Sequence, residues 1–242
     1  MELPDPLHPW DVTPREAARI QDALRPRLVA EWRPRGPIRR VAGVDVAFPG
    51  GDTARAAVVV LDARTLETLE EVVAELPLAF PYVPGLLTFR EGPAVLAAWR
   101  ELRTEPDLLL FDGAGVAHPR GMGIAAHLGL WLDRPAIGVA KSRLCGVAAE
   151  PGPERGARTP IRDTADRRRV LGTLLRTRDR VKPLWVSPGH RVDRRRAVEW
   201  VLRSGGGYRL PEPTRRADRL SKAGSRRTDP SSESGGPRRR NP

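Results

Sequence analysis

The feature that most constrains the fold is a change of hydrophobic pattern near residue 90. Before it, three runs rich in valine and alanine are joined by short turn segments, which is typical of an antiparallel meander. After it, predicted helices alternate with short apolar strands, which implies parallel strands and right-handed crossovers. The sequence therefore predicts an α/β fold with a mixed five-stranded sheet and flanking helices. The expected strands are 41–48, 56–62, 69–78, 108–112 and 136–140, and the crossover helices are 92–102 and 121–132.

The flanking parts of the chain carry further local signals. Residues 13–16 have the pattern of a capping box with proline at the first helical position, so an amphipathic helix is expected to follow. Proline, glycine and arginine between 150 and 166 predict an exposed loop. Strand-like runs occur at 170–177 and 183–187, and a last helix is expected within 193–205.

Charge favours a polyanionic partner. Lysine and arginine number 42 against 30 acids, which gives a net charge of +12, and half of that net charge lies in residues 214–242. A basic body and a basic tail can both neutralise phosphates, although charge alone shows no chemistry, and a soluble basic surface is an equally good explanation. We expect a domain over residues 1–220 and a disordered basic tail over 221–242, because the tail lacks apolar spacing.

Little else in the composition points to a special environment. Cys145 is the only cysteine, so no intramolecular disulfide can form and a reducing compartment is expected. The first residues lack a signal-peptide pattern, and no apolar run approaches the ~20 residues of a membrane span. We therefore expect a cytoplasmic protein with no membrane partner, and a monomer because no feature requires an oligomer.

Two aspartates follow apolar strand segments. Asp45 lies inside an expected strand, where a carboxylate must be paired, hydrogen-bonded or bound to a metal. Asp112 ends the segment 108–111 and precedes Gly113, at the edge where open α/β sheets place ligands. A structural aspartate and a turn aspartate are the plain alternatives. If the two strands are neighbours, the two carboxylates face each other across about 5 Å and require a compensating charge.

Glu91 is a third acid near the same expected edge. At the start of a helix its charge is explained by the helix dipole, which by itself is the simpler interpretation. With Asp45 and Asp112 it forms an oxygen-only set of ligands suited to Mg²⁺, with Mn²⁺ as an alternative. No zinc pattern competes, because the four histidines and the one cysteine are widely scattered.

Five segments around these acids resemble motifs of one known family. They are PYVPGLLTFRE (81–91), DGAGVAHPRGMGIAAHLG (112–129), GVAKSRLCG (138–146), SPGHRVD (187–193) and GYRLPEPTRRAD (207–218). In this order and spacing they resemble endonuclease V, a repair nuclease that recognises deaminated adenine. The resemblance extends to about residue 220. It implies an RNase H-like fold and a magnesium-dependent nick of DNA on the 3′ side of deoxyinosine, at the second phosphodiester bond from the lesion.

The resemblance also assigns roles to single residues. It implies that Asp45 and Asp112 bind the metal and that Glu91 is catalytic, through direct coordination or through water. It further implies a wedge that fills the gap left by a displaced base, a lesion pocket, nucleic-acid contacts, a basic residue beside the scissile phosphate and a histidine near the metal. In that order, these residues are Tyr82; Gly85, Leu87 and Gly113; His118 and Arg120; Lys141; and His190.

One departure and two rival functions stay open. Ala114 stands where many relatives have a polar or larger residue, which affects lesion contacts rather than the metal ligands. The same pocket would accept hypoxanthine in RNA, so a ribonuclease specific for inosine is one rival. A noncatalytic nucleic-acid-binding protein is the other, and the carboxylates count against it because an unused buried cluster is costly.

Overall fold

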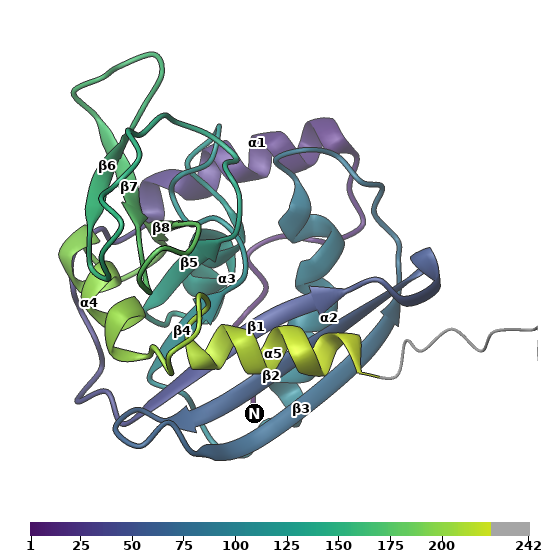
Figure 1. Cartoon of the computed structure of the whole chain (residues 1–242). Helices are drawn as coiled ribbons and strands as arrows, with labels where there is room; N and C mark the ends of the chain where they lie inside the picture. Colours follow the sequence, from purple (N-terminus) through teal and green to yellow (C-terminus); the bar gives the residue numbers. More distant parts are fainter. Residues whose placement is uncertain (224–242) are drawn as a thin grey trace, which may run out of the picture.

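One eight-stranded mixed sheet runs through residues 1–223, the part of the chain that the computed structural model describes. The strand order is β3-β2-β1-β4-β5-β8-β7-β6 (Figure 1). The strands are β1 Arg40–Ala47, β2 Thr53–Asp62, β3 Thr68–Pro77, β4 Leu108–Phe111, β5 Ala136–Ala140, β6 Arg158–Arg162, β7 Val170–Leu175 and β8 Leu184–Pro188.

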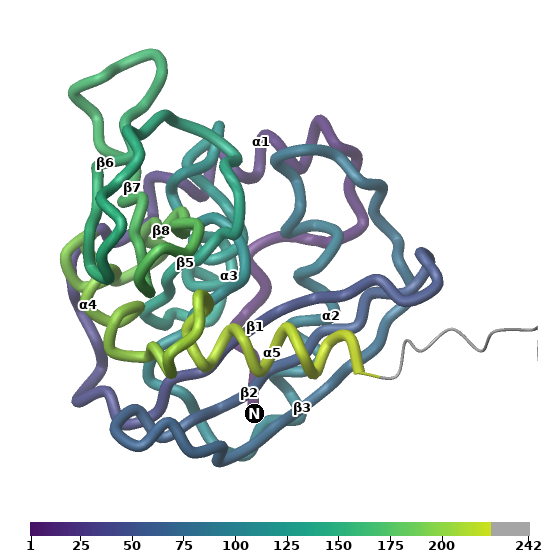
Figure 2. Tube along the Cα trace, viewed as in Figure 1, coloured from purple at the N-terminus to yellow at the C-terminus, as the bar shows by residue number. Residues whose placement is uncertain are grey.

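The first five strands confirm the predicted mixed sheet. β1, β2 and β3 pair antiparallel, whereas β4 pairs parallel with β1 and β5 pairs parallel with β4. The sheet is larger than predicted, because β8, β7 and β6 extend it by antiparallel pairing. β7 and β8 lie in the expected strand-like runs, but β6 falls where a loop was expected. The connection between β6 and β7 projects beyond the rest of the molecule (Figure 2).

The helices cover both faces of the sheet. They are α1 Pro14–Leu24, α2 Leu87–Glu101, α3 Ile124–Trp131, α4 Arg194–Arg203 and α5 Glu212–Lys222, with 3₁₀ turns at Arg25–Arg27 and Pro49–Gly51. Residues of α2 and α3 share one hydrophobic core with Ala42 and Val44 of β1, whereas residues of α4 and α5 share another with Val41. Since side chains alternate along a strand, Gly43 and Asp45 point with Val41 toward the α5 face.

Local signals placed some helices better than others. The capping box of α1 is present, with Thr13 and Glu16 bonded reciprocally. α2 begins at Leu87 and not at Gly92, so Glu91 lies in its second turn, where the dipole of the helix end no longer accounts for its charge.

The segment after α4 was expected to contain no further helix, yet α5 spans Glu212–Lys222. Two residues of α5, Ser221 and Lys222, therefore lie beyond the expected domain limit at residue 220. Residues 224–242, which hold the rest of the expected tail, lie outside the described residues. No helix within residues 1–223 is long and apolar enough to cross a membrane.

Candidate metal centre and active site

Asp45 and Asp112 lie side by side toward the carboxyl ends of the neighbouring strands β1 and β4. The parallel pairing of β1 with β4 sets Val44 opposite Phe111, the residues that precede the two aspartates. The backbone N–H of Asp112 donates to the carbonyl oxygen of Val44 at 3.0 Å. The two acidic strands are therefore neighbours, which is the condition on which the facing of the two carboxylates depends.

Asp218 of α5 completes a three-carboxylate cluster with these two aspartates. One carboxylate oxygen from each residue lies within 4.8 Å of the others, a spacing that one cation could bridge. The sequence analysis did not single out Asp218, although it ends the motif 207–218. A helical signal was also available there, because a proline at the start of a segment is typical of a first helical turn and Pro213 lies in the first turn of α5.

Gly43 allows α5 to approach β1 closely enough to deliver Asp218. A Cβ atom on Gly43 would lie 1.9 Å from the carbonyl oxygen of Pro213, which no real contact tolerates. A residue without a side chain is therefore required at this crossing.

Ser221, one turn after Asp218, holds the carboxylate of Asp45. Its hydroxyl donates to Oδ2 of Asp45 at 2.5 Å, and the serine is 0% exposed. This bond occupies one carboxylate oxygen and leaves Oδ1 of Asp45 without another hydrogen bond within residues 1–223. α5 thus supplies one acid to the cluster and orients a second.

Lys141 bridges the other two carboxylates. Its ammonium group contacts both Asp112 and Asp218, and it follows the last residue of β5. Burial by itself lowers the pKa of Lys141, but the hydrogen bonds to the two aspartates raise it overall. The guanidinium of Arg209 donates to the backbone oxygen of Lys141 at 2.8 Å and so fixes this segment.

The cluster holds more negative charge than Lys141 neutralises. Burial, followed by the charges of Asp112 and Asp218, raises the pKa of Asp45 to about 7, against the lowering effect of Ser221. Such a surplus of oxygen ligands fits a hard divalent cation, which is the expected cofactor class. Lys141 would have to yield some of its contacts to that cation.

Glu91 lies close to the cluster but outside the 4.8 Å set. It is 7% exposed, and burial, with the charges of Asp45 and Asp112, raises its pKa well above the ordinary range. Burial and the neighbouring aspartates therefore favour the protonated form of this carboxyl group. Glu91 belongs to α2, which covers the face of the sheet opposite α5, the helix that carries Asp218.

His190 is not brought to the carboxylates. Its backbone oxygen accepts from Ala136, the first residue of β5, whereas Lys141 follows the last residue of that strand. Five residues of strand span about 16 Å. Its ring bonds to Asp133 at 3.2 Å and accepts from the N–H of Val29 at 3.3 Å. The expected histidine near the metal is absent from this edge, where Asp218 lies instead.

Gly85, expected in the lesion pocket, lies in a second group with His118 and Arg120, which were expected to contact nucleic acid. The carbonyl oxygen of Gly85 accepts from His118 at 2.8 Å, Arg120 at 2.8 Å and Gln21 at 3.0 Å. Gly85 has φ +81°, which disfavours any other residue. His118 and Arg120, expected to contact nucleic acid, are therefore occupied in shaping the loop between β3 and α2.

The exposed part of this loop carries Tyr82. Its side chain is 71% exposed, so it packs on nothing that would explain it as a core aromatic. Leu87 is half-buried at the start of α2, and Ala114 is buried. A Cβ atom on Gly113 would lie 2.6 Å from Cγ2 of Ile124, so the backbone after Asp112 passes close to α3.

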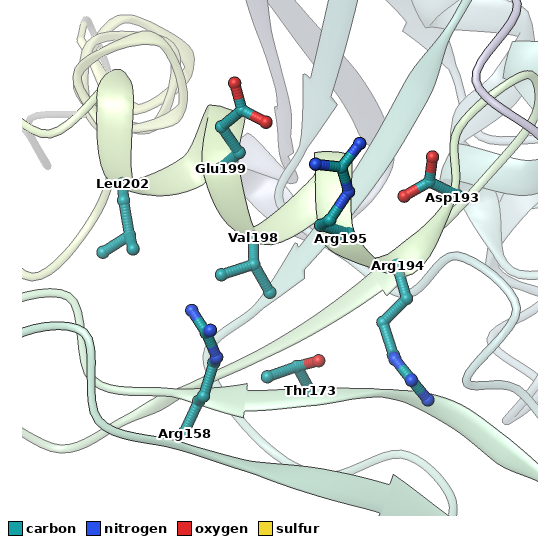
Figure 3. A pocket seen from close by; sticks show the side chains of 8 residues that line it. All are labelled: Arg158, Thr173, Asp193, Arg194, Arg195, Val198, Glu199 and Leu202. Carbon is teal, nitrogen blue, oxygen red and sulfur yellow. The ribbon is translucent and has the colours of Figure 1, made fainter.

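A groove of about 690 Å³ lies elsewhere, between β6, β7 and α4 (Figure 3). Its lining contains none of the carboxylates of the cluster: Arg158, Thr173, Asp193, Arg194, Arg195, Val198, Glu199 and Leu202. Cavity size therefore does not identify the reactive site in this molecule, and the convergence of ligand groups does.

Comparison with known protein families identifies the family of this chain. A family model described as endonuclease V matches residues 22–219. The chain belongs to the endonuclease V family. It is therefore related to nucleases, and the matched range includes all three clustered aspartates.

Individual endonuclease V proteins are similar over most of their length. The endonuclease V of Alkalilimnicola ehrlichii is 53% identical over 219 residues, which cover 90% of this chain and 95% of that protein. The crystal structure of endonuclease V from Streptomyces avermitilis has a TM-score of 0.82 and 46% identity, covering 88% of this chain and 93% of the other.

A second solved structure contains nucleic acid. Ciona intestinalis endonuclease V, in complex with a 24mer DNA containing an inosine followed by a ribo-adenosine, has a TM-score of 0.73 and 26% identity. The match covers 86% of this chain and 95% of the Ciona chain.

Proposed function

We propose that this member of the endonuclease V family is a metal-dependent repair endonuclease that nicks DNA 3′ to deoxyinosine, at the second phosphodiester bond from the lesion. The observation that carries the proposal is the convergence of Asp45, Asp112 and Asp218, supported by the inosine-containing DNA bound to the Ciona relative. Phosphodiester hydrolysis requires stabilisation of the negative charge on the phosphate oxygens. A cation held by this cluster of carboxylates would provide that stabilisation.

The cofactor in this proposal is Mg²⁺, with Mn²⁺ as the alternative. Asp45, Asp112 and Asp218 would hold it, because all three offer carboxylate oxygens within one 4.8 Å set. When bound, such an ion activates water and stabilises the negative charge that develops on the phosphate. Glu91, which is buried and has a raised pKa, is suited to hold or pass a proton at its carboxyl oxygen.

The remaining residues position the nucleic acid in this proposal. Lys141 would turn from its two aspartates to the phosphate, because its ammonium is a mobile donor on a flexible stem. Tyr82 would fill the space of the displaced base, which a flipped nucleotide leaves open. The Gly85 loop, braced by His118 and Arg120, would receive hypoxanthine by backbone groups.

The test is a nicking assay on a labelled strand with one central inosine. Wild-type protein with Mg²⁺ should nick it, whereas EDTA and Asp45→Ala should each abolish nicking. Equal nicking in all three reactions would refute the metal mechanism. Inosine-specific binding without nicking would support the noncatalytic alternative.

Cleavage of inosine-containing RNA in place of DNA is a second candidate function. The Ciona complex has a ribonucleotide directly after the inosine, which favours testing RNA as well. Matched DNA and RNA strands, each with one inosine, should be compared by single-turnover rate. A faster rate on RNA would replace the DNA-repair assignment with that of a ribonuclease acting on inosine.

A further inference from the structure

Tyr208 is an exposed aromatic residue that the proposed function leaves unexplained. It lies in the connection between α4 and α5, and its side chain is 53% exposed. The guanidinium of Arg215 lies over its ring, 4.4 Å from the centroid. One face of the ring is therefore covered by a cation, and much of the remaining surface is open to a ligand.

Arg215 is held in place by Glu212. Nε and Nη2 of Arg215 donate to the two carboxylate oxygens of Glu212, both at 2.8 Å, and Glu212 is buried. Because both contacts of the guanidinium fork are made on one side, its Nη1 donors stay available. The pair of Tyr208 and Arg215 is thus a preorganised surface rather than two mobile side chains.

Asp218 lies on the same helix, α5, close to Arg215 along its axis. Thr214, Ala217 and Ser221 are fully buried and face the sheet. The neighbouring stripe begins at Arg215 and continues to Asp218, three residues on and therefore about 4.5 Å along the axis. Arg215 consequently lies about one helical turn from Asp218, and its side chain also lines a hollow with Thr68 and Glu71 of β3.

A second connection also ties Tyr208 to the cluster. The next residue, Arg209, donates to the backbone oxygen of Lys141, whose ammonium contacts Asp112. α5, which follows Tyr208, and α2, which follows Tyr82, cover opposite faces of the sheet (Figure 1).

We propose that Tyr208, backed by Arg215, is a stacking platform for a nucleotide of the substrate strand beside the reacting phosphate, on the α5 side of the sheet. The proposal rests on the proposed function, since it takes a nucleic-acid strand as the substrate. Aromatic side chains stack on any base, and Arg215 adds the positive charge that a phosphate backbone requires. The platform fixes the position of the strand and does not read its sequence.

Strand binding without divalent metal gives a direct test, because no cleavage then occurs. A DNA strand with one inosine would carry 2-aminopurine at successive positions on either side of it. Wild-type protein should quench the fluorescence at one or two positions, and Tyr208→Phe should do the same because the ring is kept. Tyr208→Ala should abolish that quenching and weaken binding of the strand about tenfold.

Two further variants serve as controls for the role of Tyr208. Leu69→Ala, at another exposed large residue, should leave quenching and affinity unchanged. Arg215→Lys keeps the charge but loses the planar fork, and it should give an intermediate affinity. Unchanged quenching and affinity in Tyr208→Ala, with folding confirmed by circular dichroism, would overturn the platform. If the wild-type protein instead binds matched strands with and without inosine equally well, the proposed function is overturned.

Discussion

Ser221 donates a buried hydrogen bond to the carboxylate of Asp45, although the two residues are 176 positions apart in the chain. The bond joins α5 to β1 at the point where Asp218 meets Asp45 and Asp112. The docking of one helix thus both completes the cluster and sets the direction of one of its ligands.

Removal of this hydrogen bond should weaken cation binding. In Ser221→Ala, Oδ2 of Asp45 loses its donor, so the carboxylate can rotate and its pKa rises further. We expect the affinity for Mn²⁺ or Mg²⁺ to fall roughly fivefold, the value of about 1 kcal/mol for one hydrogen bond. Titration calorimetry without nucleic acid measures this. Ser204→Ala, at a buried serine outside the cluster, is the control, and equal affinities in the two variants would contradict the role of Ser221.

Neutralisation of Asp45 should stabilise the cation-free protein while it abolishes activity. The folded pKa of Asp45, about 7, is above the ordinary value of 3.8. Its contribution to stability is therefore complete below pH 3.8 and lost as the pH rises through 7. At pH 8 in EDTA, Asp45→Asn should raise the free energy of unfolding by on the order of 2 kcal/mol.

The stabilisation by Asp45→Asn should be smaller at pH 5, where the carboxyl group of Asp45 in the wild-type protein is already protonated. Saturating Mg²⁺ should reverse the order of stability, because only the wild-type protein gains binding energy. Urea unfolding at both pH values checks this. A variant that is less stable than wild type at pH 8 in EDTA would show that burial of the charge is compensated elsewhere.

A side chain at Gly43 should displace α5 and disable the cluster. The Cβ atom of Gly43→Ala would meet the carbonyl oxygen of Pro213 at 1.9 Å, so the helix must move. We expect a loss of about 2 kcal/mol in stability and weaker cation binding, measured by urea unfolding and calorimetry. Gly36→Ala, whose Cβ has no atom within 4 Å, is the matched control. Cation affinity equal to that of the control would show that the approach of α5 is not required.

Acid should destabilise the protein through a buried histidine pair. Nδ1 of His8 donates to the backbone oxygen of Pro9 at 2.8 Å, so its Nε2 accepts from Nε2 of His127 at 2.8 Å. Two neutral rings satisfy both bonds. Burial, with the repulsion that a charged His8 or His118 would exert, lowers the pKa of His127 to about 3, and burial also lowers that of His8.

The unfolded chain binds these protons near pH 6.5, but the folded protein does not, so stability falls as the pH drops below 6.5. Each histidine adds a slope of about 1.4 kcal/mol per pH unit. His127→Gln keeps an N–H donor toward His8 and cannot titrate, so the slope between pH 6.5 and 5 should become shallower. An identical slope in the variant, measured by urea unfolding, would assign the acid sensitivity to other groups.

Much of the sheet and two of its acids followed from the sequence alone. The change from alternating strands to helix-and-strand units specifies three antiparallel strands followed by two parallel ones. Asp45 and Asp112 were expected to face each other if their strands are neighbours, and the pairing of β1 with β4 meets that condition. These features depend on local periodicity and on topology rules that hold for all chains.

Only the tertiary structure brought α5 to the site. The buried stripe of α5 consists of Thr214, Ala217 and Ser221, which are small or polar, so it lacks the large apolar side chains that would mark a packed helix. Its place depends on the missing side chain of Gly43, far away in sequence. Asp218 and Ser221 could therefore not be recognised as partners of Asp45 from local pattern.

The position of His190 was decided in the same way. The sequence motif shows that a histidine follows a strand. It does not show at which end of the neighbouring strand that histidine lies. The antiparallel pairing of β8 with β5 carries His190 to the start of β5, whereas Lys141 lies at its end. Residue order along the chain is a local property, whereas the end of a sheet at which a side chain lies depends on the direction of strand pairing. That direction is set by long-range packing.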